Sequence, residues 1–336
     1  MSWYEILLPI AASSFVLAVT PWVLRYARRT ELLALPSARS SHVRPTPQGG
    51  GLGIAVAFLL VVLADATVGD RVTDLHVALL GGGGLVALTG WFDDRRTLNS
   101  YLRLLLYGLA AAWAVGWLGG MPSLRFGASV LWLRGAGFLM AWLLIVFLTN
   151  IYNFMDGIDG IAGLEGVTTC LIAGALAFLT GDRQLASLAF SLGGASLGFL
   201  VWNWPPAKIF MGDVGSNFLG YSIAVLAISS EERGGPSLMT WIVLLGVFVV
   251  DGAATLARRL CMRKSPRVAH RTHAYQGAVQ KGYSHARVAL AVLCLNICLG
   301  AVAAIGSRLP VAGLALGLGA FLVLLALHWH YSPLRH

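Results

Sequence analysis

The stretch GAGFLMAWLLIVFLTNIYNFMDGIDGIAG, residues 135–163, decides the class of fold. Its first part, residues 135–150, carries no charged side chain, and Asp156 and Asp159 follow within ten residues of its end. An apolar segment of about 20 residues spans a bilayer as a helix. An ionisable group at membrane depth indicates a functional site. The stretch therefore predicts a membrane helix that ends in a functional site.

The composition extends this prediction to the whole chain. Of 336 residues, 57% are hydrophobic and only 12% are charged, and the mean hydropathy is +0.74. We expect an all-α, polytopic membrane protein with one integral-membrane domain over residues 1–336 and about eleven spans. The spans are predicted near 3–25, 50–68, 76–92, 101–119, 135–150, 160–180, 185–202, 214–230, 238–258, 286–306 and 309–329.

The distribution of Lys and Arg predicts the orientation in the membrane. With eleven spans the two termini lie on opposite sides. If the N-terminus is outside, 18 of the 24 Lys and Arg residues fall in inner loops or the C-terminal tail. Because cytoplasmic loops carry an excess of these residues, we expect the N-terminus outside and the C-terminus in the cytoplasm. The acidic motifs then face the cytoplasm.

Charge and cysteine content exclude several other classes. The net charge of +9 comes from short loops beside spans, where anionic membrane lipids explain it better than nucleic acid does. Four cysteines fall in or beside spans and do not form a disulfide or zinc pattern; they are Cys170, Cys261, Cys294 and Cys298. The first apolar segment has full membrane length and is followed by a basic loop, so we expect it to remain as a span.

The first acidic motif is GWFDDRRTL, residues 90–98, at the end of a predicted span. One Asp here is explained by a hydrated helix end with local ion pairs. Two adjacent acids, Asp93 and Asp94, directly after two aromatic residues favour a functional site.

The second motif is the polar series that follows residues 135–150. Asn150, Asn153, Asp156 and Asp159 recur every three residues. If the segment is helical, this spacing places the four side chains along one slowly drifting stripe. A turn or cap explains one acid but not the whole series, so the series favours a binding site.

The third motif is WNWPPAKIFMGDVGSN, residues 202–217. Asn203 and the Pro-Pro pair end a span, Phe210 offers an aromatic face that can stack on a base, and Asp213 can ligate a metal. Asp213 can equally cap the next helix, and both roles can hold together.

The fourth motif is AHRTHAYQ, residues 269–276, in a loop rich in basic residues. No Cys or acid lies at zinc-ligand spacing from its histidines. A phosphate-binding patch fits His270, Arg271 and His273 better, with Arg103 as a further contributor. Acids for Mg²⁺, cations for phosphate and an aromatic ring at one membrane face suit the joining of a nucleotide-diphosphate substrate to a lipid.

In these motifs the chain resembles the polyprenyl-phosphate N-acetylhexosamine-1-phosphate transferases, glycosyltransferase family 4. The resemblance rests on SSHVRPTPQGGGLGI, FDDRRTL, NIYNFMDGIDGIAG, NWPPAKIFMGDVGS and DGAATLARRLCMRKSPRVAHRTHAYQ. It implies transfer of a sugar 1-phosphate from a UDP-N-acetylhexosamine to undecaprenyl phosphate with release of UMP. The form HRTHAYQ is similar to the O-antigen-initiating branch, whose donors include 6-deoxy sugars; it implies a role in lipopolysaccharide or related cell-envelope glycan synthesis.

The resemblance also implies a role for each site residue. Asp213 would ligate Mg²⁺, or Mn²⁺ in its place, with Asn153 as second ligand. Asp93 and Asp94 would face the lipid phosphate, and Asp156 the sugar phosphate. The substrate-binding residues would be Asp159 and Phe210 at the uracil, His270, Arg271 and His273 at the diphosphate and sugar, and Lys208, Asn203 and Arg103. Direct displacement and a double displacement through an aspartyl phosphate both stay open, as does a homodimer.

Three alternatives remain beside this reading. A transferase of the common-antigen type would use N-acetylglucosamine. A CDP-alcohol phosphotransferase is suggested by DGAATLARR, residues 251–259, but the Ala-Arg pair falls two positions too late, and Asp251 then reads as a buried residue supporting the site. A sugar-nucleotide or lipid transporter would carry its polar residues near the midplane in repeated halves, whereas these acids gather at one face.

Overall fold

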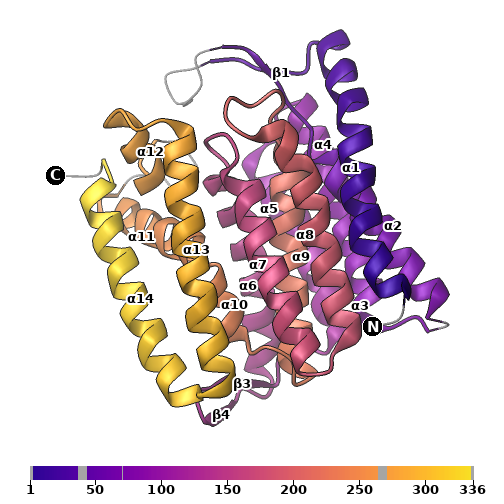
Figure 1. Cartoon of the computed structure of the whole chain (residues 1–336), viewed down its shortest axis with the longest axis vertical. Coiled ribbons are helices and arrows are strands. Elements are labelled where there is room, and N and C mark those ends of the chain that lie inside the picture. Colours follow the sequence, from indigo (N-terminus) through magenta and orange to yellow (C-terminus); the bar gives the residue numbers. More distant parts are fainter. Residues whose placement is uncertain (1–2, 37–43, 70, 264–270, 334–336) are drawn as a thin grey trace.

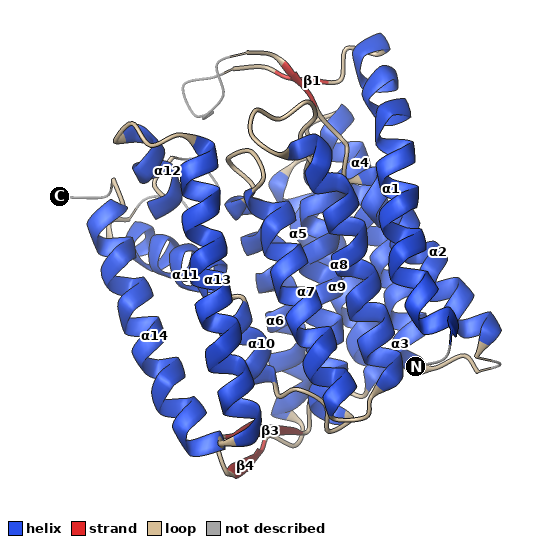
Figure 2. Ribbon diagram, in the orientation of Figure 1, coloured by secondary structure: helices blue, strands red, loops and turns tan. Residues whose placement is uncertain are grey.

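A computed structural model describes residues 3–36, 44–69, 71–263 and 271–333. In these ranges the chain forms a bundle of long helices with two small antiparallel hairpins (Figure 1) (Figure 2). The helices are α1 (Trp3–Arg29), α2 (Leu52–Val68), α3 (Asp74–Val77), the π-helical turn η1 (Ala78–Gly82), α4 (Gly83–Arg95), α5 (Ser100–Leu118), α6 (Ala136–Met155), α7 (Ile161–Leu179), α8 (Arg183–Asn203), α9 (Asp213–Glu232), α10 (Leu238–Leu244), α11 (Gly246–Cys261), α12 (Ala274–Gln280), α13 (His285–Arg308) and α14 (Pro310–Tyr331). The strands are β1 (Leu33–Ala34), β2 (Thr46–Pro47), β3 (Ser123–Phe126) and β4 (Ser129–Trp132).

Helix α9 is the centre of the bundle. Every residue from Val214 to Glu231 is buried, and the helix packs mainly against α4 and α6. Halfway along it, the Tyr221 hydroxyl donates to the carbonyl of Ala78 at the start of η1, over 2.8 Å. Because protein surrounds α9, its serines and asparagine cost less than they would against lipid. The first residue of this central helix is Asp213.

Eight helices in the described ranges are long and apolar enough to cross a membrane, or nine if the bent pair α10 and α11 forms one span. This confirms the prediction of an all-α polytopic membrane protein. All eleven predicted segments are helical, but α2 has only 17 residues and α9 is not among the eight. Length and composition alone therefore identify eight or nine crossings in the described ranges, and α2 and α9 are the two further helices of the predicted eleven.

The segment predicted as one span over residues 238–258 is bent by 82° between α10 and α11. The apolar run continues through the bend, which is why sequence periodicity did not reveal it. Beyond the bend, Asp251, Thr255 and Arg259 follow at intervals of four on α11, and all three are buried. Such a stripe lies on one helix face. The bend turns this polar face of α11 toward the protein.

The bundle has two distinct ends (Figure 1). The N-terminus lies near the end that carries the β3–β4 hairpin, whereas the chain leaves α14 at the end that carries α12. The C-terminal ends of α4, α6 and α8 lie at the same end as α12, and the acidic motifs lie at these helix ends or shortly after them. We refer to this end as the carboxylate end and to the other as the opposite end.

Candidate active site

The N-terminus of α9 is capped by an aspartate from another helix. The two carboxylate oxygens of Asp94, near the end of α4, accept from the backbone N–H groups of Asp213 (2.8 Å) and Val214 (3.1 Å). These amides have no partner within α9, and a carboxylate at a helix N-terminus is stabilising. The close approach requires Gly90, because a Cβ there would lie 2.5 Å from the carbonyl oxygen of Asp213. The FDD motif is therefore fixed directly against the GDVGS motif.

Arg103 links two of the predicted site acids. Its Nη1 lies 2.5 Å from Asp93 Oδ2 and 3.1 Å from Asp213 Oδ2. The other carboxylate oxygen of Asp93 accepts from the backbone N–H of Leu98 over 2.6 Å. Asp93 is buried, and its carboxylate is held by these two donors, Leu98 before α5 and Arg103 near the start of α5. Through these contacts, Asp93 can hold the guanidinium of Arg103 next to Asp213.

The predicted polar stripe is interrupted by the end of α6. Asn153 still lies on the helix, and its Nδ2 donates to Asp213 Oδ1 (2.8 Å) and Ser216 Oγ (2.9 Å). The helix ends at Met155, so Asp156 and Asp159 stand on the following loop, not on the helical face that the spacing suggested. Asn150 instead donates to the carbonyl of Val146 in its own helix. Glycines at 157 and 160 favour this early end, and Gly160 adopts a φ of +81°.

Asp159 and Asn203 join the loop after α6 to the loop after α8. Asp159 Oδ2 accepts from the backbone N–H of Ala207 over 3.1 Å and lies 3.3 Å from His285 Nδ1. Asn203 Oδ1 accepts from the N–H of Gly160 (2.9 Å), while its Nδ2 donates to the carbonyl of Ile209 (3.0 Å). Asn203 thus holds the shape of both loops.

The segment that carries Phe210 is held by the loop before α2. The Phe210 N–H donates to the carbonyl of Pro47, and the Phe210 carbonyl accepts from the N–H of Gly50. Gln48 in this loop also donates its Nε2 to the carbonyl of Asp94 over 3.0 Å. Lys208 is exposed, and its Nζ lies 5.0 Å from the centre of the Trp202 ring.

Four of the acids meet at one cavity of about 280 Å³ at the carboxylate end, which we name the carboxylate cavity. It is lined by Gln48, Asp94, Asn153, Asp156, Gly157, Ile158, Asp159, Asn203, Phe210, Gly212, Asp213, Gln276 and His285. No Lys or Arg belongs to this lining within the part of the chain that the structure describes. Asp93, Arg103 and Lys208 stand outside it.

The basic motif contributes in a way that the sequence did not predict. His270 lies outside the described residues. The carbonyl of Arg271 accepts from Gln280 Nε2, and His273 is buried 3.6 Å from Asp251 rather than lining the cavity. The next turn supplies Gln276 instead, and the start of α13 supplies His285.

Sequence reasoning missed His285, Gln276 and Gln48. His285 lies directly after Ser284, whose side chain caps α13, and it stands one residue before the span predicted at 286–306. One signal could have revealed His285: it is a polar residue at the end of a predicted span, on the same side of the membrane as the acids. Gln276 and Gln48 lie within the quoted motifs AHRTHAYQ and SSHVRPTPQGGGLGI, but neither was assigned a role.

The lining acids repel one another. Burial, together with the nearby carboxylates of Asp213 and Asp159, raises the pKa of Asp156 to about 7. No three His, Cys, Asp or Glu side chains in the described ranges are arranged to hold a metal by themselves. Mg²⁺, however, is commonly bound through one or two carboxylates together with water and substrate phosphates. An acidic cavity around Asp213 and the Asn153 amide fits that mode of binding.

Comparisons with known proteins agree with this arrangement. A sequence profile described as glycosyl transferase family 4 matches residues 76–231, the range that contains every acid of the carboxylate cavity. The chain is 31% identical over 286 residues to the probable undecaprenyl-phosphate N-acetylglucosaminyl 1-phosphate transferase of Bacillus subtilis, covering 83% of this chain and 78% of that protein. The chain belongs to the polyprenyl-phosphate N-acetylhexosamine-1-phosphate transferase family.

Further relatives in this transferase family differ in their named sugar. The decaprenyl-phosphate N-acetylglucosaminephosphotransferase of Mycolicibacterium smegmatis is 30% identical over 336 residues, with 88% of this chain and 80% of that protein covered. The phospho-N-acetylmuramoyl-pentapeptide-transferase of Moorella thermoacetica is 32% identical over 285 residues, with 78% and 86% covered. The family is therefore established, while these names leave the sugar undecided.

Proposed function

We propose that the protein transfers an N-acetylhexosamine 1-phosphate from a UDP-sugar to undecaprenyl phosphate and releases UMP. The observation that carries this proposal is the convergence of Asp94, Asp156, Asp159 and Asp213 on a cavity with no Lys or Arg in its described lining. Such a cavity favours a cation and, through it, a diphosphate. Relatives named for sugar-phosphate transfer to polyprenyl phosphates support the same reaction over transport.

The proposed reaction is a displacement at phosphorus. An oxygen of the lipid phosphate forms a bond to the phosphorus that bears the sugar, and the bond from that phosphorus to the oxygen of UMP breaks. The products are a lipid-linked diphosphate sugar and UMP, and no oxidant or further reactant is needed. We favour direct displacement because the lipid phosphate is already a nucleophile, so that catalysis consists mainly of positioning and charge neutralisation.

Asp213, with the Oδ1 of Asn153 as second ligand, would hold Mg²⁺, or Mn²⁺ in its place. When bound, this ion would neutralise negative charge on the diphosphate. Arg103 lies on the far side of Asp213 and meets Asp93, so we propose that this pair faces the lipid phosphate. Asp159 and Phe210, on opposite loops of the cavity, are proposed to hold uracil, with Asp156 nearer the sugar phosphate.

We also propose eleven membrane passages with the carboxylate end in the cytoplasm of a bacterial inner membrane. The positions of the termini at opposite ends of the bundle and the excess of Lys and Arg in the loops of one side support this orientation. The HRTHAYQ segment supports the O-antigen branch and a 6-deoxy sugar as donor.

The test is UMP release by protein solubilised in detergent and incubated with undecaprenyl phosphate and Mg²⁺. A panel of donors would contain UDP-N-acetylglucosamine, UDP-N-acetylgalactosamine, their 6-deoxy analogues and UDP-N-acetylmuramoyl-pentapeptide. We expect one N-acetylhexosamine donor to give UMP, and a chelator to stop its release. Folded protein that gives no UMP with any of these donors would overturn the proposal, and preference for the 6-hydroxylated sugar would overturn the O-antigen assignment.

A further inference from the structure

A second set of buried polar groups lies behind the carboxylate cavity, around Asp251 of α11. This residue is buried and belongs to the polar stripe of its helix. Its Oδ1 accepts from Thr255 Oγ1 (3.2 Å) and lies 2.9 Å from Nδ1 of the buried His328 on α14. A buried carboxylate persists only where such partners compensate for its loss of water. Asp251 therefore joins two helices, and it also contacts a third.

The third element is α12. Asp251 Oδ1 accepts from the backbone N–H of Ala274 (2.9 Å), and Oδ2 accepts from the N–H of Tyr275 (3.3 Å). These are the first two amides of α12, which have no partner within the helix. A helix of only seven residues is not stable by its own hydrogen bonds, so tertiary contacts must fix its position. The Asp251 carboxylate is one such contact.

The other side of α12 forms part of the carboxylate cavity. Gln276 is in its lining. The Tyr275 hydroxyl donates over 3.1 Å to the carbonyl of Phe154, in the last turn of α6. Contact with the next loop is close, since a Cβ on Gly157 would lie 2.1 Å from Tyr275 Oη and 3.0 Å from Gln276 Nε2. A shift of α12 would therefore move the wall beside Asp156 and Asp159.

The end of α14 packs against α12 and the residues that flank it. Lys281 Nζ donates to the carbonyl of His330, and Ser332 Oγ donates to the carbonyl of Thr272. A Cβ on Gly277 would lie 1.9 Å from the carbonyl oxygen of Tyr331, so the two backbones are in direct contact. Together with His328, these contacts fix α12 between the C-terminal helix and the site.

We propose that Asp251 is a positioning residue for the donor side of the active site. By capping α12 and pairing with His328, it holds Gln276 and Tyr275 against the loop that carries Asp156 and Asp159. This proposal rests on the proposed function for its kinetic consequence, because that loop is the one assigned to the sugar nucleotide. Its structural consequence, the order of α12, does not depend on the reaction.

Three variants in detergent test it: Asp251→Ala, Asp251→Asn and Glu165→Gln. The Asn variant keeps a neutral acceptor for the two amides, and the Ala variant keeps none. Glu165 is a matched control, because it is an equally buried acid that bonds Asn296 on α13 and contacts no part of α12 or the carboxylate cavity among the described residues. Hydrogen exchange of the α12 amides and separate KM values for UDP-sugar and undecaprenyl phosphate are the readouts.

We expect α12 to exchange about tenfold faster in Asp251→Ala and by an intermediate factor in Asp251→Asn. KM for the UDP-sugar should rise by about the same factors, while KM for the lipid stays within about twofold of wild type. Unchanged α12 exchange in both Asp251 variants overturns the proposal, as does an equal effect of Glu165→Gln. If Asp251→Ala does not fold, the test is the comparison of α12 exchange between Asp251→Asn and Glu165→Gln. Wild type without UMP release defeats the proposed function alone, since the exchange comparison still applies.

Discussion

The two ends of the bundle each hold a polar cavity lined by four acids, and they differ in what faces those acids. The cavity at the opposite end has a volume of about 490 Å³, and its acids are Glu5, Asp65, Asp74 and Glu232. Arg71, Arg183 and Arg233 line the same cavity. In the carboxylate cavity, by contrast, no Lys or Arg is found in the described lining.

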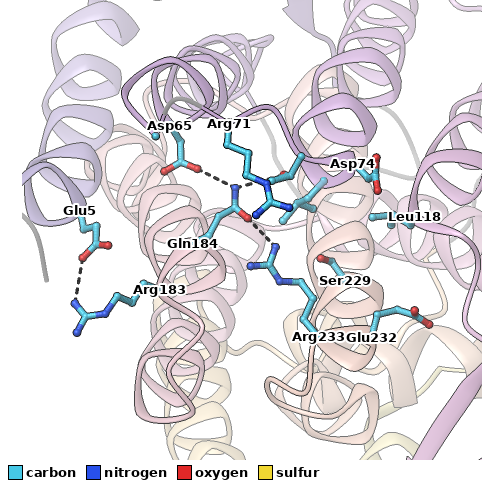
Figure 3. A pocket seen from close by; sticks show the side chains of 13 residues that line it. Glu5, Asp65, Arg71, Asp74, Leu118, Arg183, Gln184, Ser229, Glu232 and Arg233 are labelled. Atoms are coloured by element: carbon cyan, nitrogen blue, oxygen red, sulfur yellow. Dashed lines mark hydrogen bonds and ion pairs between the residues drawn. The ribbon is translucent and has the colours of Figure 1, made fainter.

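Contacts at the opposite end bind helices to one another. Gln184 stands between Asp65 and Arg233, donating to the first over 3.2 Å and accepting from the second over 2.7 Å (Figure 3). His76 lies 2.9 Å from Asp65, and Arg183 lies 3.7 Å from Glu5. These pairs connect α1, α2, α3 and α8 with Arg233, the residue directly after α9. Acids that are paired in this way serve the fold. In the carboxylate cavity, Asp213 pairs with Arg103, which stands outside the lining, but Asp94 and Asp156 pair with no Lys or Arg among the described residues. Such crowding of acids indicates a cation-binding site.

The largest effect expected from this contrast is the loss of reaction in Asp213→Asn. Removing the proposed Mg²⁺ ligand should reduce UMP release by about 10³-fold, as expected when charge neutralisation at the transferring phosphoryl group is lost. Asp65→Asn removes an acid from the opposite cavity and should leave UMP release within about threefold of wild type. Steady-state UMP assays on both variants make the comparison. Equal losses would remove the distinction between the two ends.

A smaller loss is expected in Arg103→Met, because Arg103 is the cation between Asp93 and Asp213. Without it the two acids repel each other, and kcat should fall about 10- to 100-fold. Arg103→Lys keeps the charge but not the planar guanidinium, and we expect it to recover part of the activity. Turnover at saturating substrates measures this effect. Wild-type kcat in Arg103→Met would show that the pair plays no part in the reaction.

Gly157→Ala tests the packing between α12 and the acidic loop. The added Cβ would collide with Tyr275 Oη, so one of the two segments must move. KM for the UDP-sugar should rise about tenfold. Gly84→Ala is the control, because nothing lies within 4 Å of its Cβ position. KM titrations that show no difference between the two alanine variants would mean that this contact does not shape the donor site.

Crowding of the acids also predicts a pH dependence of stability. The pKa of Asp156 is raised from 3.8 to about 7, so the folded protein binds a proton that the unfolded chain releases. The stabilising contribution of that proton is complete below pH 3.8 and is lost as the pH rises through about 7. Without Mg²⁺, the thermal midpoint in detergent should fall between pH 6 and 8. Asp156→Asn should flatten this slope, and an unchanged slope would contradict the crowding.

The smallest effect should come from Arg233→Ala at the opposite end. Arg233 pairs with Asp182 over 2.8 Å and with Gln184, but it is partly exposed. Its loss should lower stability by only about 1 kcal/mol and leave both KM values unchanged. Thermal unfolding together with kinetics measures this. A change in KM would show that the opposite cavity communicates with the site.

Sequence reasoning predicted the parts of this protein that depend on local composition. Apolar segments gave the helices, and the motifs at their ends gave Asp94, Asp156, Asp159 and Asp213, which the fold brings to one cavity. It could not separate Asp93 from Asp94, because adjacent residues on a helix point in different directions and only the packing on α9 distinguishes them.

The bend at Leu245 and the role of α12 could not be predicted from the sequence for a different reason. The bend lies inside a continuous apolar run, and α12 is positioned by Asp251 and His328, which are separated from it by 23 residues or more. Gln276 enters the site only through that placement of α12, and His285 enters it through the placement of α13. Non-local contacts of this kind leave no periodicity in the sequence.

The most direct test of the central claim is a titration of Mn²⁺, as a spectroscopic substitute for Mg²⁺, in the presence of UDP, followed by electron paramagnetic resonance. Wild type, Asp213→Asn and Asp65→Asn would be compared in the same detergent. We expect wild type and Asp65→Asn to bind Mn²⁺ with equal affinity, and Asp213→Asn to bind at least about tenfold more weakly. Equal affinity in all three proteins would contradict the claim that the crowded acids of the carboxylate cavity form the metal-dependent active site.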